Sequence, residues 1–155
     1  MQNDDYLNKD FLQGHEIWLK QSKQFFEQSL PLLDQFFSSP YANEEEALFA
    51  LDEMIYYFKA QIKSQQNFFH FLPPIDPSRQ SLFPKYFSML AEMTDESVNL
   101  LHEKMRTKIE KKTSPQSLRD FYELWLECGE EVYQKWLHTD KFLAAFGEIM
   151  DGMFR

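Results

Sequence analysis

Cys128, the only cysteine of this 155-residue sequence, is a candidate for a catalytic nucleophile. It lies between Glu127 and Gly129 in a segment with helical periodicity. Nearby carboxylates raise the pKa of a thiol rather than lower it. His138 follows ten residues later, which is about 15 Å along a straight helix. We therefore interpret Cys128 as a small buried thiol, and the sequence predicts no catalytic residue.

Carboxylates and histidines are the next candidates, for acid/base chemistry or for metal binding. Four glutamates share one face of the same predicted helix: Glu123, Glu127, Glu130 and Glu131. Such a row could form a cation site, but it is more typical of a solvated helix face. The four histidines are scattered singly, and none follows a glutamate in the Glu-x-x-His spacing of di-iron bundles. The sequence predicts no metal site and no cofactor.

Aromatic residues are the most distinctive feature of the sequence. They make up 17% of it, with 16 Phe, 7 Tyr and 3 Trp. This exceeds what one small bundle readily buries, and exposed aromatic surface is typical of partner-binding sites. We predict a partner-binding set near the C-terminal end: Phe121, Tyr122, Trp125, Tyr133, Trp136 and Phe146. In the alternative, these rings pack against the first helices of the same chain.

The composition predicts that helices position these residues. The sequence has only two Val, six Ile and four Thr, so it is poor in the residues that favour strands. Four glycines argue against a Rossmann or P-loop fold, whereas abundant Gln, Glu, Lys, Leu and Met favour helix. We predict an all-α fold, an elongated bundle of five to six helices with long, coiled-coil-like antiparallel pairs.

Two long helices are predicted in the N-terminal half. The first runs over about 5–37 with core residues seven positions apart, and Pro31 is expected to kink or interrupt its last turn. The second follows the N-cap Asn43 and runs to Leu72. Its apolar seam begins with Leu48, Leu51, Ile55, Phe58 and Ile62. The side chains expected to widen it are Phe49, Tyr56, Tyr57 and Phe68.

Glu44, Glu45 and Glu46 stand in the first turn of that second helix. They could form an acidic docking patch. Carboxylates in a first turn also interact favourably with the helix dipole, and we adopt this second interpretation.

Four shorter helices are predicted in the C-terminal half. They are a helix over about Ser81–Met93, one capped by Thr94, one capped by Ser114 with Pro115 at its first position, and one capped by Thr139. We accordingly divide the chain into a long helical hairpin (1–72), a proline-rich connection (73–84) and a C-terminal helical segment (85–155).

Charge and cysteine content limit the partners and the compartment. The net charge of −9 argues against nucleic acid or an anionic membrane as the main partner. A single cysteine suits a reducing cytoplasm. The acidic N-terminus precedes no apolar run, and no apolar run is long enough to span a membrane. We predict a cytoplasmic protein without a signal peptide or transmembrane segment.

The stretch from Ser117 to Tyr133 resembles a known family. Its core pattern is Tyr122-x-x-Trp125-x-x-Cys128-x-Glu130-x-Val132-Tyr133, and Thr139, Phe142, Gly147 and residues 148–152 continue the similarity. This pattern resembles the E-subunit (PhaE) family of class III polyhydroxyalkanoate (PHA) synthases. The resemblance covers about 114–155.

The resemblance implies a non-catalytic accessory subunit. Its partner would be the catalytic C subunit, an α/β-hydrolase-like enzyme whose own Cys-His-Asp triad polymerises (R)-3-hydroxyacyl-CoA into polyester granules. The E subunit binds that enzyme and is needed for its full activity, so the resemblance also implies a location at the granules. Family members usually continue beyond the equivalent of Arg155 into a charged helical tail, and functions of that tail are not implied here.

Two other functions stay open at this point. One is a phasin-like structural protein that lays an amphipathic helical face on the polyester granule surface. The other is a homodimeric helical adaptor, because a homo-oligomer is also compatible with the sequence.

Overall fold

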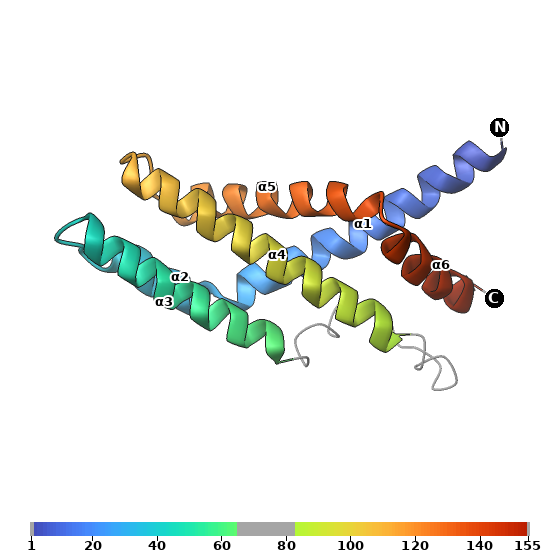
Figure 1. Ribbon diagram of the computed structural model, residues 1–155, viewed down its shortest axis with the longest axis horizontal. Helices are drawn as coiled ribbons and strands as arrows, with labels where there is room; N and C mark the ends of the chain where they lie inside the picture. Colours follow the sequence, from blue (N-terminus) through green and yellow to red (C-terminus); the bar gives the residue numbers. More distant parts are fainter. Residues whose placement is uncertain (1, 65–82, 155) are drawn as a thin grey trace.

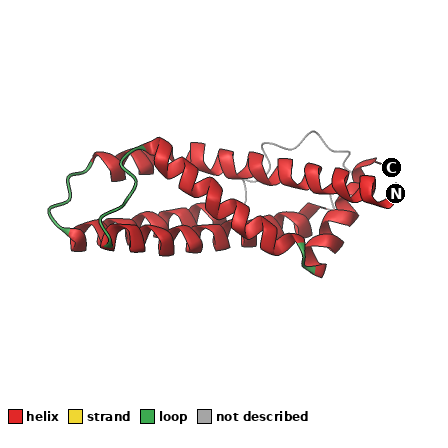
Figure 2. Ribbon diagram, turned by 90° about the horizontal axis from the view of Figure 1, so that it is seen from above, coloured by secondary structure: helices red, strands yellow, loops and turns green. Residues whose placement is uncertain are grey.

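A computed structural model describes residues 2–64 and 83–154, with side chains over 14–64 and 88–147. These ranges contain six helices and no strand, which confirms the predicted all-α fold. The helices are α1 (Gln2–Gln28), α2 (Leu30–Ser38), α3 (Glu44–Lys63), α4 (Phe83–Glu110), α5 (Leu118–Leu137) and α6 (Asp140–Phe154). The bundle is elongated in both views (Figures 1 and 2).

The helices form a four-layered bundle in which neighbouring helices are antiparallel and the first layer, α1 with α2, meets the last, α5. The joined helices α1 and α2 contact both α3 and α5, and α4 lies between α3 and α5 (Figure 1). Two contacts show that α3 and α4 are antiparallel. His102 bonds Asp52, and Lys59, further along α3, faces Asp95, which comes earlier on α4. The short helix α6 packs against α4 and α5 at one end of the bundle.

One hydrophobic core runs along the axis of this bundle. Every long helix contributes large buried side chains, among them Trp18, Leu33, Leu51, Phe58, Met93, Leu101, Phe121, Trp125 and Tyr133. Helices from both sides of the predicted connection therefore share this core. Most of that connection, 73–84, lies outside the described residues, although Phe83 and Pro84 already belong to α4.

The first predicted helix is two helices. α1 ends at Gln28, and Pro31 lies in the first turn of α2, where its missing N–H costs little. The break shifts the buried face by one position. Leu32, which continues the predicted seven-residue spacing of Trp18 and Phe25, is half-buried, and Leu33 is buried instead. Pro31 therefore interrupts the helix as predicted, but earlier than its last turn.

The second predicted helix begins where expected and ends early. The side chain of Asn43 accepts a hydrogen bond from the amide of Glu46 at 2.9 Å, which confirms the N-cap. The prediction that the helix runs to Leu72 is wrong at Ser64, which already lies outside α3, and 65–72 lie outside the described residues. Leu51, Ile55, Phe58 and Ile62 are buried as predicted.

The third and fourth predicted helices are one helix, α4. Thr94 does not cap a helix but lies buried in the middle of α4, where its hydroxyl donates to the carbonyl of Leu90 at 2.8 Å. Ser97 does the same to Met93 at 2.9 Å. A hydroxyl that bonds the preceding turn is satisfied inside a helix, so Thr94 is no helix boundary here.

The fifth predicted helix starts three residues later than expected. Ser117, not Ser114, has the extended backbone of an N-cap, and its hydroxyl accepts from the amide of Asp120 at 3.1 Å. Residues 111–117 are needed to turn the chain back, so Pro115 lies in the loop. The predicted cap at Thr139 is confirmed by a hydrogen bond from the Phe142 amide at 3.2 Å.

Candidate functional site

The predicted partner-binding residues lie on α5 and α6, and five of the six are buried among the chain's own helices. Phe121, Trp125, Tyr133, Trp136 and Phe146 are buried, and Tyr122 is half-buried. Trp125 shows the arrangement best. Its ring stacks on Phe25 at a centroid distance of 5.3 Å, and its indole N–H donates to the carbonyl of Ser22 at 2.9 Å.

Phe121 and Tyr122, about one turn before Trp125 on α5, pack against the N-terminal helices α1 and α2. Tyr122 lies 4.7 Å from Phe26 between ring centroids, and Phe121 packs edge-on against Phe37 of α2 at 5.5 Å. A cavity of about 10 Å³ adjoins this cluster, beside Phe25 and Trp125. It is no larger than one water molecule requires, so it is too small for an acyl chain.

Tyr133 and Phe146 belong to a second cluster near the C-terminal end of α5. Tyr133 packs edge-on against Phe142 of α6 at 5.7 Å and against His15 of α1 at 5.3 Å. Burial, followed by the charge of Glu130, raises the pKa of the Tyr133 hydroxyl. His15 also bonds Glu130 directly, so this cluster joins α1, α5 and α6.

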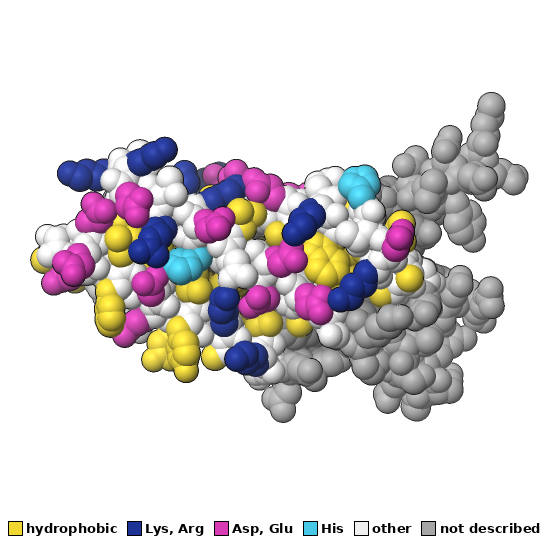
Figure 3. All heavy atoms as spheres, in the orientation of Figure 1, with side chains coloured by type: hydrophobic (Ala, Val, Ile, Leu, Met, Phe, Trp, Pro, Cys, Tyr) yellow, Lys and Arg dark blue, Asp and Glu magenta, His cyan; other side chains and the backbone are white. Residues whose placement is uncertain are grey.

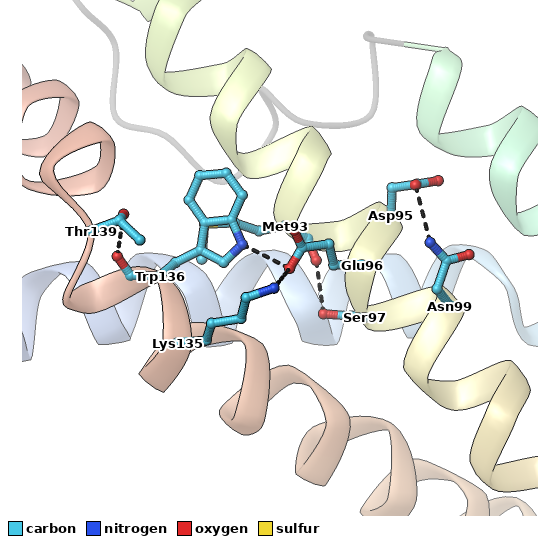
Figure 4. A network of polar contacts seen from close by, with 8 residues as sticks. All are labelled: Met93, Asp95, Glu96, Ser97, Asn99, Lys135, Trp136 and Thr139. Carbon is cyan, nitrogen blue, oxygen red and sulfur yellow. Dashed lines mark hydrogen bonds and ion pairs between the residues drawn. The ribbon is translucent and has the colours of Figure 1, made fainter.

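Trp136 belongs to a polar network on the outside of α4 and α5 (Figure 4). Its indole N–H donates to Glu96 at 2.9 Å, and Lys135 reaches the same carboxylate oxygen at 3.4 Å. The ammonium of Lys141 lies 5.5 Å from the centre of the Trp136 ring. Trp136 therefore joins α5 to α4 rather than standing free on the surface.

The structure therefore favours the alternative that these rings pack within the chain. It brings Phe121, Tyr122 and Trp125 together against α1 and α2, and Tyr133 and Phe146 together at α6. Trp136 stands apart, on α4. None of these contacts tests binding to another protein, so that role of the six residues stays a prediction.

The carboxylates of α5 serve as ion-pair partners. Lys104 of α4 lies 3.2 Å from Glu127 and 2.6 Å from Glu131, both exposed, as predicted for a solvated face. Glu130 is half-buried and bonds His15. Among the residues that the structure describes, no group of three or more His, Cys, Asp or Glu side chains could hold a metal ion.

Cys128 is buried on α5, as predicted. Burial raises the pKa of its thiol from 9.0 to about 12, with the charges of Glu131 and Glu127 adding to the shift and Lys104 opposing it. The thiol therefore stays protonated at neutral pH. This environment does not activate a nucleophile.

Exposed aromatic side chains on α3 are the feature that sequence reasoning missed. Phe49, Tyr56 and Tyr57 are 65%, 71% and 52% exposed, so the prediction that they widen the buried seam is wrong. At about 100° per residue, Phe49 and Tyr56 fall on the side of the helix opposite Leu51 and Phe58. That angular position was the signal that could have identified them.

No helix within the described residues is both long and apolar enough to cross a membrane. Neither a curated protein nor a solved structure matches this chain.

A family model does match the chain. The model of the poly(R)-hydroxyalkanoic acid synthase subunit (PHA_synth_III_E) matches residues 78–155, a range that includes all of α4, α5 and α6. The match confirms the resemblance carried by the Tyr122 to Tyr133 pattern. Because it spans half of the sequence, the chain belongs to the poly(R)-hydroxyalkanoic acid synthase subunit family.

Proposed function

We propose that this chain is a non-catalytic accessory subunit that binds the catalytic subunit of a class III PHA synthase and raises its activity. Family membership supports a place in the synthase. The burial of Cys128 is the observation that carries the accessory role, because it is the chain's only cysteine. The family resemblance implies that a cysteine nucleophile does the chemistry, and such a nucleophile must be accessible and ionisable.

The surroundings of Cys128 support this assignment in two ways. Its pKa is raised to about 12, so the thiol stays protonated at neutral pH. Its neighbours on the exposed side of α5 are Glu127 and Glu131, which are held by Lys104. Both carboxylates pair with the ammonium group of Lys104, and their charges raise the pKa of the thiol rather than lower it.

The proposed partner also gives the chain a place in the cell. An enzyme that extends polyester from a CoA thioester works where the polymer accumulates, so we place the accessory subunit in the cytoplasm at the surface of polyester granules. Separation of granules from cytosol, followed by detection of the chain in each fraction, tests this location. Recovery from the cytosol alone while the catalytic subunit is on granules would contradict it.

Mixing the chain with the class III catalytic subunit from the same source tests the function. Size-exclusion chromatography with light scattering reports the complex, and CoA release from 3-hydroxybutyryl-CoA reports the activity. We expect a stable complex that is more active than the catalytic subunit alone. The Cys128→Ser variant is expected to activate equally well, because this cysteine takes no part in the chemistry.

Two results would overturn the proposal. The absence of a complex between folded proteins would remove the accessory role. Binding of the chain to enzyme-free granules without any complex would favour the phasin-like alternative. If no complex forms, the light-scattering mass of the chain alone tests the adaptor alternative, which requires a homodimer.

A further inference from the structure

The solvent side of α3 carries the largest group of exposed aromatic side chains in the described part of the structure. Phe49, Tyr56 and Tyr57 are each more than half exposed. Phe49 and Tyr56 are seven residues apart and so lie two turns apart on one line of the helix, and the rings of Tyr56 and Tyr57 meet edge-on at 5.8 Å. Figure 3 shows hydrophobic side chains protruding over α3, at the lower left of the molecule.

Carboxylates stand between these rings. Glu45 lies one turn before Phe49, and Glu53 lies between Phe49 and Tyr56 on the same side of the helix. Together, Glu45, Phe49, Glu53, Tyr56 and Tyr57 form a stripe about 18 Å long, which we call the α3 stripe. All five of its residues are exposed.

The carboxylates of the α3 stripe have no ion-pair partner among the described residues. Two of the basic side chains on or beside α3 pair with other carboxylates: His102 bonds Asp52 at 2.7 Å, and Lys59 lies 3.9 Å from Asp95. Glu46, next to the stripe, accepts the amide of Ala42 at 2.9 Å and so closes the helix N-terminus. The helix-dipole interpretation accounts for Glu44, Glu45 and Glu46 in the first turn, but it does not reach Glu53, which is beyond that turn.

The charge of this surface narrows the choice of occupant. The exposed charged residues of α3 are five acids, Glu44, Glu45, Glu46, Asp52 and Glu53, and one base, Lys63. A second base, Lys59, is half-buried and faces Asp95. Two copies that met through this surface would bring like charges together, which disfavours a homodimer. A bare polyester surface offers no cation to these carboxylates. An apolar surface bordered by Lys or Arg would complement both the rings and the charges.

We infer that the α3 stripe is a docking site for an apolar, positively charged surface of the catalytic subunit. The inference rests on the proposed function for the identity of the partner. Aromatic side chains are enriched among the residues that dominate binding energy, and charge pairs around them direct the encounter. This surface lies on α3, outside the range 78–155 that the family model matches.

The test compares a variant of the α3 stripe and a control variant with the unmodified chain. Phe49→Ser, Tyr56→Ser and Tyr57→Ser are combined in one triple variant. Leu143→Ala on α6 is the control, since Leu143 is 52% exposed and lies on another helix. Both variants alter exposed side chains, so their thermal unfolding is expected to match that of the unmodified chain. Titration calorimetry with the catalytic subunit then gives the dissociation constants.

We expect the triple variant to bind about 10- to 100-fold more weakly, and the Leu143→Ala variant to bind as the unmodified chain does. A Glu45→Lys, Glu53→Lys variant is expected to bind more weakly too, and its binding is expected to depend less on salt concentration.

The outcomes separate this inference from the proposed function. If the unmodified chain binds and the triple variant binds equally well, the docking site lies elsewhere and the accessory role stands. If the unmodified chain does not bind at all, the proposed function fails and the partner named here fails with it. A triple variant that loses self-association or granule binding, while keeping its affinity for the catalytic subunit, would assign the stripe to another occupant and overturn the inference.

Discussion

Trp18 and Trp125 form a reciprocal pair across α1 and α5. The indole N–H of Trp18 donates to the carbonyl of Gly129, four residues after Trp125, and the indole N–H of Trp125 donates to the carbonyl of Ser22, four residues after Trp18. Both hydrogen bonds are buried and 2.9 Å long. A shift of one helix relative to the other by a single turn would break both at once.

Gly129 lies where α5 meets α1. The position of a β-carbon there would lie 3.5 Å from both the Trp18 indole nitrogen and the Ser22 hydroxyl, which is ordinary van der Waals contact. Cys128 is buried beside it on the same helix. The family pattern around Trp125, Cys128 and Glu130 therefore describes the contact of α5 with the rest of the bundle.

Replacing Trp125 by alanine separates the core role from a partner-binding role. We expect Trp125→Ala to lower the free energy of unfolding by about 3–5 kcal/mol, because it removes a large buried ring and leaves a cavity. Urea denaturation followed by circular dichroism measures the change. Tyr122→Ala is the control, since Tyr122 is half-buried on the same helix, and a loss of about 1 kcal/mol is expected.

The opposite pattern would contradict this expectation. If Trp125→Ala left unfolding unchanged but weakened binding to the catalytic subunit, Trp125 would be a contact residue, as the sequence first led us to predict.

Much of the fold could be predicted because local chemistry determines it. Asn43 and Thr139 cap helices as expected. A side-chain oxygen just before a helix can accept a hydrogen bond from one of the first backbone amides, which have no partner within the helix. The buried seam of α4, Val98, Leu101, Met105 and Ile109, follows from spacing alone.

What could not be predicted depends on contacts between distant residues. Thr94 has the same chemistry as Thr139, and only burial of its helix decides that its hydroxyl bonds the preceding turn. Trp125 would look the same in a core or at an interface until Phe25 and Ser22 are placed against it. Phe49 was misassigned because hydrophobicity was considered without its angle around the helix.

Gly14 is expected to accommodate a side chain less well than Gly147 does. A β-carbon there would lie 3.0 Å from the Tyr133 hydroxyl oxygen and 3.2 Å from the Phe146 ring, both buried. We expect the crowding to exceed the gain in helix propensity, so that Gly14→Ala lowers the free energy of unfolding by about 0–2 kcal/mol. Gly147→Ala is the control: nothing lies within 4 Å of its β-carbon position, and better helix propensity is expected to raise stability by about 0.5–1 kcal/mol. Equal effects of the two variants on thermal unfolding would show that the contact at Gly14 is not close.

Glu96 and Glu92 compare a hydrogen-bonded carboxylate with a simple surface ion pair. Glu96 accepts from the Trp136 indole and pairs with Lys135, whereas Glu92 pairs with Lys141 on the exposed surface. We expect Glu96→Ala to cost about 1–3 kcal/mol, because the indole N–H of a buried ring loses its acceptor. Glu92→Ala is expected to cost about 0–1 kcal/mol. Equilibrium unfolding gives both values, and a larger loss for Glu92→Ala would refute this assignment.

Cys128 is expected to make the chain sensitive to alkaline pH. Because burial raises its pKa from 9.0 to about 12 in the folded state, the unfolded chain loses the thiol proton first as the pH rises. The stabilising contribution is fully present below pH 9 and is lost between pH 9 and about 12. The measurement is the difference in unfolding free energy between the unmodified chain and the Cys128→Ala variant. Both contain the same lysines and tyrosines, so most of the effect of their titration cancels in this difference. We expect that difference to shrink as the pH rises through this window.

The thiol of Cys128 is also expected to react with a disulfide reagent at pH 8 only after the chain is unfolded in urea. Rapid reaction of the folded chain would mean that Cys128 is accessible. The argument for a non-catalytic subunit would then lose its main support.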